Sequence, residues 1–399
     1  MPSTAAFRRE IELVLPDRPF ELEFWDGHVV PATRPGGPRI CVRSPATVSQ
    51  VLFAPGQLGL GRAYVAGNLD VDDLDRVMPL LATWSPPDPA PGKRLRLAAA
   101  ALRAAGPHPP PKPPAAEMRP AGLRHSLRRD RRAVRHHYDV SNAFFALFLD
   151  ASMTYSCAIF SRGATTLEEA QRAKLDLVCS KLALQPGERL LDVGCGWGAL
   201  ALHAAREYGV DVLGITLSEQ QAALATERVR DAGLAGQVEI RVADYRELEA
   251  TDFDAVASVG MVEHVGEGQM DVYAQRLAGY LKPGGRLLNH GIACLRHGGP
   301  PAGAFSERYV FPDGQPVQLS GVLRPLERAG LIVEQVEGFA TDYAETLRHW
   351  YERLDAQLEA AERLAGTDRV RVWRLYLRAA RNGFLTGFTS VYQIRATKC

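Results

Sequence analysis

The sequence has no long apolar run and almost no net charge. Its 399 residues carry 47 Lys and Arg against 46 Asp and Glu, a formal net charge of +1. This near-equality of positive and negative charge argues against a protein that coats nucleic acid with its whole surface. We therefore expect no nucleic-acid partner. Residues 1–20 lack the apolar segment of an export signal, and no stretch is apolar enough to span a bilayer, which together predict a cytoplasmic protein.

Cysteine is sparse, and its spacing forms no known motif. The six cysteines, at positions 41, 157, 179, 195, 294 and 399, form no C-x-x-C pair. Disulfide frameworks and zinc sites need clustered cysteines, so we expect reduced thiols, no disulfide and no bound metal.

Proline divides the chain into three parts. Eleven of the 27 prolines lie between Pro86 and Pro120, around a short basic stretch. This composition predicts a semi-rigid, partly disordered linker over residues 85–125. We expect a small amino-terminal domain over residues 1–84 and a larger catalytic domain over residues 126–399.

Within residues 1–84, apolar pieces alternate with turn-forming residues. Four short pieces have the composition of strands, namely IELVL, FELEF, HVVPA and RICVR. The stretch 58–81 that follows them predicts a helix, a turn and a second helix. These elements are typical of a small α+β domain.

From residue 189 onward, strand-like and helix-like segments alternate. Seven strands are expected, at RLLDVG, DVLGITL, VEIRVAD, FDAVASVG, RLLNHGIA, LIVEQVEGF and FLTGFTSVYQI. Strands that alternate with helices form a mostly parallel sheet with helices on both faces. We therefore predict an α/β fold with a seven-stranded, doubly wound, Rossmann-like sheet. Ligands of such sheets bind beyond the carboxyl ends of the strands.

A glycine-rich turn, Asp192-Val-Gly-Cys-Gly-Trp-Gly198, follows the first of these strands and opens a helix. Glycines let a ligand approach the backbone, although such a turn can also be purely structural. The second strand ends in Gly214-Ile-Thr-Leu-Ser218, without the acidic residue that holds the ribose of NAD. The G-x-G-x-G spacing resembles motif I of class I S-adenosylmethionine methyltransferases. A cationic sulfonium also suits a strand that ends in Asp192 better than a phosphate does.

Chemically versatile residues lie at several predicted strand ends. Glu263 and His264 follow the fourth strand, and His290 ends the fifth. Cys157 lies before the sheet, and Tyr343 follows the sixth strand. Each of these residues taken alone fits a packed structural group as well as a functional one. Glu263 stands out, because a carboxylate beside His at a strand end is either solvated or functional.

Several longer motifs identify a family that residues 126–399 resemble. They are HYDVSNAFFALFLD, MTYSCAIF, KLDLVCSKLALQPGERLLDVGCGWG, GITLSEQQ, SVGMVEHVG and DYAETLRHW. All resemble the cyclopropane-fatty-acid synthase family, which includes the mycolic acid cyclopropane synthases and related fatty-acyl methyltransferases. DVGCGWG alone is typical of any methyltransferase, whereas TYSC together with EHVG and VYQ is far more specific. The piece LGLGRAYVAGNLDVDDLD more weakly resembles the amino-terminal domain of the longer bacterial synthases.

The resemblance implies methyl transfer from S-adenosylmethionine to the double bond of an unsaturated fatty acyl chain of a phospholipid. The methylated chain is a carbocation, and loss of a proton to a bound bicarbonate closes the cyclopropane ring. The positions that match the base site are Cys157, Glu263, His290 and Tyr343, with the backbone of Ile292. A carboxylate acceptor with imidazole and phenol donors would fix such a small base in a dry cavity.

Two further sets of residues follow from the same resemblance. Tyr138 and Tyr343 are expected to stabilise the cationic chain through their ring faces. The cofactor site is expected to comprise Tyr155, Ser156, Asp192, Gly194, Gly196, Thr216, Leu217, Gln221, Asp244, Tyr245 and Arg246.

An acyl chain in a bilayer must be reached from water, and two basic stretches offer a means. Residues 119–137 contain seven Arg and one Asp, and residues 93–103 are also basic. Each cation near an anionic membrane surface contributes about 1 kcal/mol, although a solvated basic linker has the same composition. We expect peripheral binding to the inner face of the membrane, with the amino-terminal domain docking lipid.

The product and the oligomeric state stay open at this level. The segment 297–320 departs from the common cyclopropane synthases. Some actinobacterial relatives form 10-methylene chains, which a separate reductase converts to 10-methyl. A methyltransferase for a small metabolite and a catalytically silent lipid-binding module are further alternatives, and the intact base-site residues argue against the silent module. The sequence is compatible with a monomer and with a homodimer.

Overall fold

The chain divides into two compact units in the computed structural model, which describes residues 3–106, 111–118, 122–138, 141–295 and 304–399. Unit 1 comprises residues 1–118, 303–309 and 366–382, and unit 2 comprises residues 119–302, 310–365 and 383–399. Unit 1 therefore includes two pieces of the region predicted as the catalytic domain. A single boundary along the sequence cannot represent this division.

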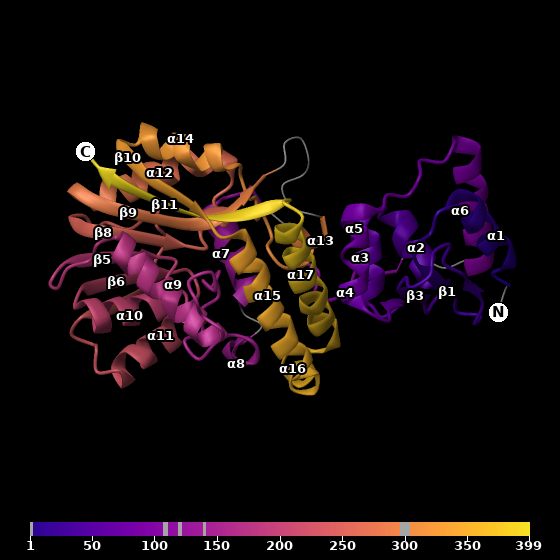
Figure 1. The fold of residues 1–399 in the computed structure, drawn as a ribbon, viewed down its shortest axis with the longest axis horizontal. Helices are drawn as coiled ribbons and strands as arrows, with labels where there is room; N and C mark the ends of the chain where they lie inside the picture. The colour runs from indigo at the N-terminus through magenta and orange to yellow at the C-terminus, as the bar shows by residue number, and fades with distance from the viewer. Residues whose placement is uncertain (1–2, 107–110, 119–121, 139–140, 296–303) are drawn as a thin grey trace. The chain divides into compact units, whose positions relative to one another are not determined.

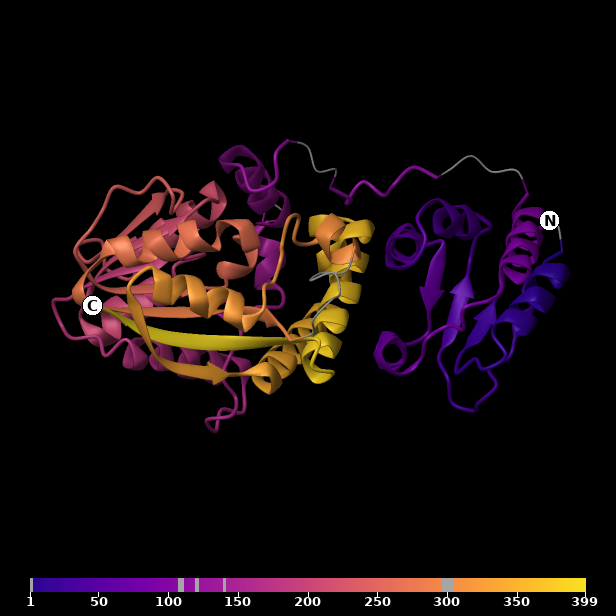
Figure 2. The same cartoon turned by 90° about the horizontal axis from the view of Figure 1, so that it is seen from above.

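Unit 1 is built on a four-stranded sheet with the strand order β2-β1-β3-β4 (Figure 2). Strand β1 pairs antiparallel with β2 and parallel with β3, and β3 pairs antiparallel with β4. The elements of this unit are α1 (Ala5–Val14), β1 (Glu21–Glu23), β2 (Val29–Val30), β3 (Arg39–Val42), α2 (Ala46–Phe53), α3 (Gln57–Val65), β4 (Leu69–Val71), α4 (Leu74–Val77), α5 (Leu80–Thr83), α6 (Pro91–Ala105), α13 (Ala304–Tyr309) and the greater part of α17 (Thr367–Leu385).

Two predictions for this unit were wrong in detail. The first four residues of IELVL lie in helix α1, where Phe7 and Ile11 pack on Phe24 at a helical spacing of four residues. Residues 58–81, predicted as two helices and a turn, contain strand β4 between α3 and α4. The other three predicted strands are present as β1, β2 and β3.

Part of the predicted linker is a helix. Helix α6 has Pro91 at its first position, where proline suits a helix start. Ala101 and Ala105 on this helix are buried against Val48 of α2. Within the stretch predicted as a semi-rigid, partly disordered linker, residues Pro91–Ala105 are therefore an ordered helix. Residues 107–110 and 119–121 of the predicted linker lie outside the described residues.

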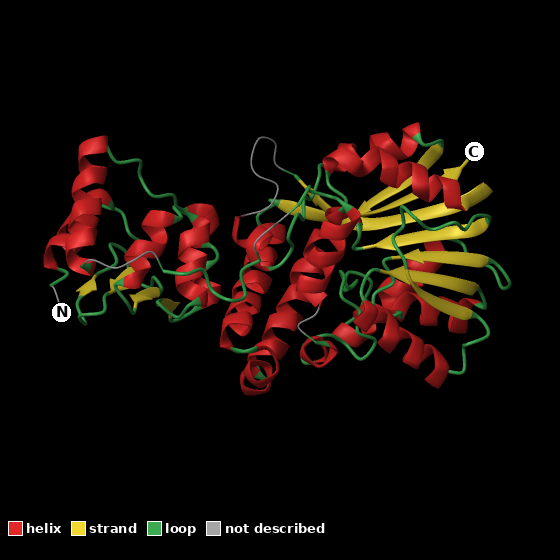
Figure 3. Ribbon diagram, turned by 180° about the vertical axis from the view of Figure 1, so that it is seen from behind, coloured by secondary structure: helices red, strands yellow, loops and turns green. Residues whose placement is uncertain are grey.

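Unit 2 contains the predicted seven-stranded sheet, with the order β10-β11-β9-β8-β5-β6-β7 (yellow arrows in Figure 3). Strand β11 runs antiparallel between β9 and β10. The other five strands, β9, β8, β5, β6 and β7, are parallel to one another. The elements of this unit are α7 (Leu127–Tyr138), α8 (Asn142–Ala146), α9 (Leu167–Lys181), β5 (Arg189–Val193), α10 (Ala199–Tyr208), β6 (Asp211–Thr216), α11 (Glu219–Asp231), β7 (Val238–Val242), β8 (Phe253–Val259), the 3₁₀ turns η1 (Val262–His264) and η2 (Glu267–Gln269), α12 (Met270–Tyr280), β9 (Leu281–Cys294), α14 (Leu319–Arg328), β10 (Leu331–Gly338), α15 (Ala340–Asp355), α16 (Leu358–Ala365) and β11 (Thr389–Lys398). The predicted α/β class is confirmed.

Helices cover both faces of this sheet. Leu190 on β5 joins the cluster that includes α9, α10 and α11, whereas the next residue, Leu191, joins the cluster that includes α12 and α14. Figure 1 shows these two groups of helices on opposite sides of the strands. A parallel sheet covered on both faces presents its strand ends to a ligand, and the carboxyl ends are the usual site.

Candidate active site

A cavity lies at the carboxyl ends of β5 and β6. Its lining includes all eleven residues predicted for the cofactor site: Tyr155, Ser156, Asp192, Gly194, Gly196, Thr216, Leu217, Gln221, Asp244, Tyr245 and Arg246. The lining also includes Asp130, Lys174 and Met261, which the prediction did not contain. Segments that are up to 135 positions apart in the sequence, from Asp130 to Val265, thus meet in one place.

The glycine-rich turn shapes one wall of this cavity. Gly194 has φ +82° and Gly198 has φ +80°, left-handed values that glycine adopts without strain. A Cβ atom at Gly194 would lie 3.2 Å from the Met261 side chain. Gly198 precedes α10 and has no side chain with which to cap it, so the first N–H groups of α10 remain for a ligand.

The end of β6 is held by a short hydrogen-bond chain. The Gln221 backbone N–H donates to the Ser218 hydroxyl at 3.2 Å and begins helix α11. The Gln221 side chain accepts from the Thr216 hydroxyl at 2.8 Å. All three residues are buried, so the lining side chains of Thr216 and Gln221 are fixed relative to each other.

Two buried ionisable groups lie in the cavity wall. Burial raises the pKa of Asp192 to about 7, and the nearby Lys174 opposes this shift. Burial lowers the pKa of Lys174, on α9, to about 8, and its Nζ lies 3.1 Å from the Ser156 hydroxyl. Within the described part of the chain, Asp192 Oδ2 has no hydrogen-bond partner. Asp192 is therefore a buried carboxylate that still has an unused acceptor.

Arg246 joins the cavity wall to helix α7. Its guanidinium donates to both carboxylate oxygens of Asp244, at 2.9 and 2.7 Å. The same group lies 2.9 Å from Asp130 Oδ2 on α7. The hydrogen bonds to Asp244 raise the pKa of Arg246, and burial raises the pKa of Asp130. Arg246 thus acts as a bridge between two partly or fully buried carboxylates.

A second polar cluster lies at the ends of β8 and β9. The Ile292 N–H donates to Glu263 Oε1 at 2.8 Å, and the Gln393 amide nitrogen lies 3.1 Å from His290 Nδ1. Burial raises the pKa of Glu263 to about 7 and lowers that of His290 to about 3. Among the residues that the structure describes, neither Glu263 Oε2 nor His290 Nε2 has a hydrogen-bond partner, and both atoms are shielded from solvent.

Cys157 and Tyr343 are brought toward this second cluster by Phe339. The Phe339 carbonyl lies 3.8 Å from Cys157 Sγ, and its N–H donates to the Val391 carbonyl at 2.9 Å. Val391 faces Ile292 across the β11–β9 pair. Tyr343 lies in the first turns of α15, which Phe339 precedes. Burial raises the pKa of Cys157 well above its ordinary value, so the side chain stays a thiol at neutral pH.

The last predicted residue, Tyr138, is the final residue of α7. Its side chain lies outside the described part of the structure, so its contact with a cationic chain stays a prediction. Within the described ranges, no group of three or more His, Cys, Asp or Glu residues could hold a metal ion.

The sheet order and the glycine-rich cavity define a class I methyltransferase that uses S-adenosylmethionine. The family model described as Mycolic acid cyclopropane synthetase matches residues 125–394. The chain belongs to this family, which confirms the resemblance seen in the sequence motifs.

Similar proteins cover nearly the whole chain. A probable fatty acid methyltransferase of Pseudomonas putida is 40% identical over 391 residues, which are 95% of this chain and 92% of that protein. The tuberculostearic acid methyltransferase UfaA1 of Mycobacterium tuberculosis is 32% identical over 98% of this chain and 90% of its own. The cyclopropane-fatty-acyl-phospholipid synthase of Escherichia coli K12 is 36% identical over 89% of this chain and 86% of its own.

A solved structure also resembles the catalytic region. The mycolic acid cyclopropane synthase CmaA1, in complex with SAH and CTAB, has a TM-score of 0.64 and 34% identity, over 67% of this chain and 98% of that chain. These comparisons make the protein an S-adenosylmethionine-dependent methyltransferase of the fatty acid methyltransferase and cyclopropane synthase type.

The Arg246 bridge leads to a first prediction. Arg246→Gln should weaken binding of S-adenosylhomocysteine by about 10-fold, or about 1.4 kcal/mol, because Asp244 in the cavity wall loses its counter-charge. Titration calorimetry on the full chain measures this. Arg241→Gln, which removes an exposed guanidinium paired with Glu239, is the matched control and should leave binding unchanged. Equal affinities of wild type and Arg246→Gln would reject the role of the bridge.

Proposed function

We propose that this methyltransferase adds the methyl group of S-adenosylmethionine to the double bond of an unsaturated acyl chain of a membrane phospholipid and closes a cyclopropane ring. The proposal rests chiefly on Glu263 Oε2 and His290 Nε2, two buried atoms without partners among the described residues. Ring closure requires removal of a proton in a dry site, and this cluster has the groups to hold a small base. The named activities of the relatives support an acyl substrate.

In this proposal the eleven residues of the cavity hold the cofactor, which supplies an electrophilic methyl group on a positively charged sulfur. Asp192 contributes a buried acceptor that no described residue uses, which fits a cationic ligand. Thr216 and Gln221 keep one wall fixed, and Ala199 and Leu200 in the first turn of α10 line another part of the cavity. The nearby Lys174 opposes the effect of burial on the pKa of Asp192 and so favours the charged form of this carboxylate.

The second cluster fits a bicarbonate, which would supply the base. With the Gln393 amide nitrogen as the donor, His290 Nδ1 accepts and the proton of this neutral imidazole lies on Nε2. Nε2–H is then a donor toward the site, while Glu263 Oε2 is an acceptor. The Ile292 N–H keeps the carboxylate in place. One buried donor and one buried acceptor match an anion that carries a single O–H.

We also propose that the protein reaches its substrate as a peripheral membrane protein, with unit 1 docking lipid. Among the described residues there is no helix long and apolar enough to cross a bilayer. The basic stretch 119–137 has less free charge than its composition implies, because Arg129 donates twice to Asp313 at 2.6 Å and Arg131 pairs with Glu247. Fewer than the seven Arg side chains of residues 119–137 would therefore be available to attract anionic lipid.

A second candidate product is the 10-methylene acyl chain. The same methylation would form it if the carbocation lost a different proton, and a separate reductase would then convert it to the 10-methyl chain. The similarity to a tuberculostearic acid methyltransferase over 98% of this chain favours it specifically. The segment 297–320, where the sequence departs from the common cyclopropane synthases, lies partly outside the described residues.

Expression in a host rich in monounsaturated phospholipids tests both candidates. We expect its acyl chains to gain the mass of one CH₂ group, as measured by mass spectrometry of the fatty acids. Ozonolysis then separates the products, since it cleaves an exomethylene group and leaves a cyclopropane intact. Acyl chains of unchanged mass, with a folded protein that binds S-adenosylhomocysteine, would reject an acyl substrate.

A further inference from the structure

Residues 154–161 contribute to both sites. Tyr155 and Ser156 line the cofactor cavity, whereas the next residue, Cys157, lies at the second cluster beside Phe339. The placement of this one segment therefore determines how the methyl donor and the base face each other.

Helix α9 holds the cofactor half of the segment. The Gln171 side chain donates to the carbonyls of Thr154 and Ser156, at 3.2 and 3.0 Å. Lys174 donates to the Ser156 hydroxyl at 3.1 Å. Gln171 and Lys174 are 1% and 2% exposed, so these bonds do not compete with solvent.

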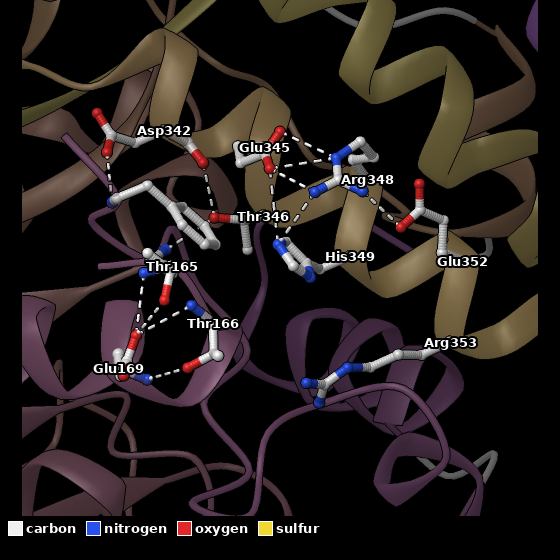
Figure 4. A network of polar contacts seen from close by, with 12 residues as sticks. Thr165, Thr166, Glu169, Asp342, Glu345, Thr346, Arg348, His349, Glu352 and Arg353 are labelled. Carbon is white, nitrogen blue, oxygen red and sulfur yellow. Dashed lines mark hydrogen bonds and ion pairs between the residues drawn. The ribbon is translucent and has the colours of Figure 1, made fainter. Parts of the chain in front are cut away.

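Helix α15 holds the other half. The Ala158 N–H donates to the Thr346 hydroxyl at 3.0 Å, and that hydroxyl donates to the Asp342 carbonyl at 2.7 Å. The Asp342 carboxylate accepts the N–H groups of Phe160 and Ser161, at 2.6 and 2.7 Å. Figure 4 shows the Asp342 carboxylate and the Thr346 hydroxyl on α15, each with its dashed contacts.

We propose that Asp342 and Thr346 are positioning residues that set the placement of Cys157 relative to Tyr343. The two residues flank Tyr343 in α15, and their partners begin directly after Cys157. Three hydrogen bonds thus join the neighbours of two base-site residues that are 186 positions apart in the sequence. The proposal rests on the base site described under the proposed function.

A purely helical role explains these side chains less well. A Thr hydroxyl inside a helix commonly bonds the carbonyl four residues before it, as Thr346 does with Asp342. Thr346 in addition accepts an N–H from a distant segment, and the Asp342 carboxylate accepts two. An acidic residue in a first turn stabilises its own helix through the dipole, which needs no such partners.

The test is a pair of substitutions at Thr346 in the full chain. Thr346→Val keeps the shape and removes the hydroxyl, whereas Thr346→Ser keeps the hydroxyl. We expect Thr346→Val to lower kcat by about 10- to 100-fold, since small displacements at a reacting centre have effects of this size. It should also raise the bicarbonate concentration needed for half-maximal turnover, measured in bicarbonate-depleted buffer. Affinity for S-adenosylhomocysteine should change less than about twofold, because α9 still holds Ser156.

Two control variants make the result specific. Thr346→Ser should retain wild-type turnover and bicarbonate dependence, and Gln171→Leu should weaken S-adenosylhomocysteine binding because the cofactor half loses its two bonds. Asp342→Asn, which keeps an acceptor but loses its charge, should give a smaller loss of kcat in the same direction as Thr346→Val.

Three outcomes would overturn the proposal. They are wild-type turnover in Thr346→Val, equal losses in the Val and Ser variants, and a loss of S-adenosylhomocysteine affinity in Thr346→Val as large as its loss of turnover. Wild-type turnover that is independent of bicarbonate would instead reject the assigned base. In that case, the difference in kcat between Thr346→Val and Thr346→Ser would still test whether Thr346 is a positioning residue.

Discussion

Glu263→Gln should lower turnover on the order of 10²- to 10⁴-fold, the range that positioned proton-transfer groups contribute. The amide keeps the shape of the side chain and can still accept from the Ile292 N–H, which donates to Glu263 Oε1 at 2.8 Å. It cannot provide the negative charge that would accept an O–H from the base. Affinity for S-adenosylhomocysteine should stay nearly unchanged, because Glu263 does not belong to the lining of the cofactor cavity.

Mass spectrometry of the acyl products measures the loss, and titration calorimetry measures the affinity. Glu267→Gln is a suitable control, since this exposed carboxylate lies four residues further along the chain and should be dispensable. Wild-type turnover in Glu263→Gln would reject the assignment. A matching loss of cofactor affinity would place Glu263 in the wrong site.

The same substitution should make the protein relatively more stable at alkaline pH. Burial raises the pKa of Glu263 from its ordinary value of 4.5 to about 7. Between these values the unfolded chain has lost a proton that the folded chain retains, so the free energy of unfolding falls as the pH rises through this window. The amide introduced by Glu263→Gln does not titrate, so the variant escapes this loss. The difference between variant and wild type should grow by up to about 3 kcal/mol between pH 4 and pH 8.

Urea unfolding of both full-length proteins across this pH range measures the difference. Glu359→Gln, which removes a carboxylate whose side chain is 93% exposed, is the matched control for the loss of a carboxylate. His290, whose pKa burial lowers to about 3, contributes in the opposite direction below pH 6.5, so the wild type alone shows a partly cancelled slope. A pH-independent difference for Glu263→Gln would mean that Glu263 ionises as easily in the folded protein as in the unfolded chain.

The meeting of the predicted cofactor residues in one cavity could be foreseen from the sequence, because many of them lie at motif positions on strand ends. Strand ends of a parallel sheet share one edge, so Asp192, Thr216 and Asp244 had to lie near one another. Lys174 was missed, because it lies inside helix α9 and only the three-dimensional fold brings it beside Asp192. Asp130 was noted in the sequence only as the single acidic residue of the basic stretch 119–137. Its contact with Arg246 was not predicted.

The amino-terminal unit was predicted less well for a related reason. IELVL is rich in β-favouring residues, and its composition favoured a strand over the helical spacing of Phe7 and Ile11. Strand β4 is only three residues long, so pairing with β3 decides its conformation rather than any pattern of its own. Helix α6 lies between two proline-rich stretches, and their composition concealed the buried alanines of this helix.

The position of β11 in the sheet has a consequence for the order of assembly. This strand is the last of the seven along the chain, yet it lies between β9 and β10. Until it is synthesised, two strands made earlier have open edges facing each other, and such edges invite pairing with other chains. Gln393, the partner of His290, arrives on the same strand. Closure of the sheet and formation of the contact between Gln393 and His290 are therefore one event in the assembly of the chain.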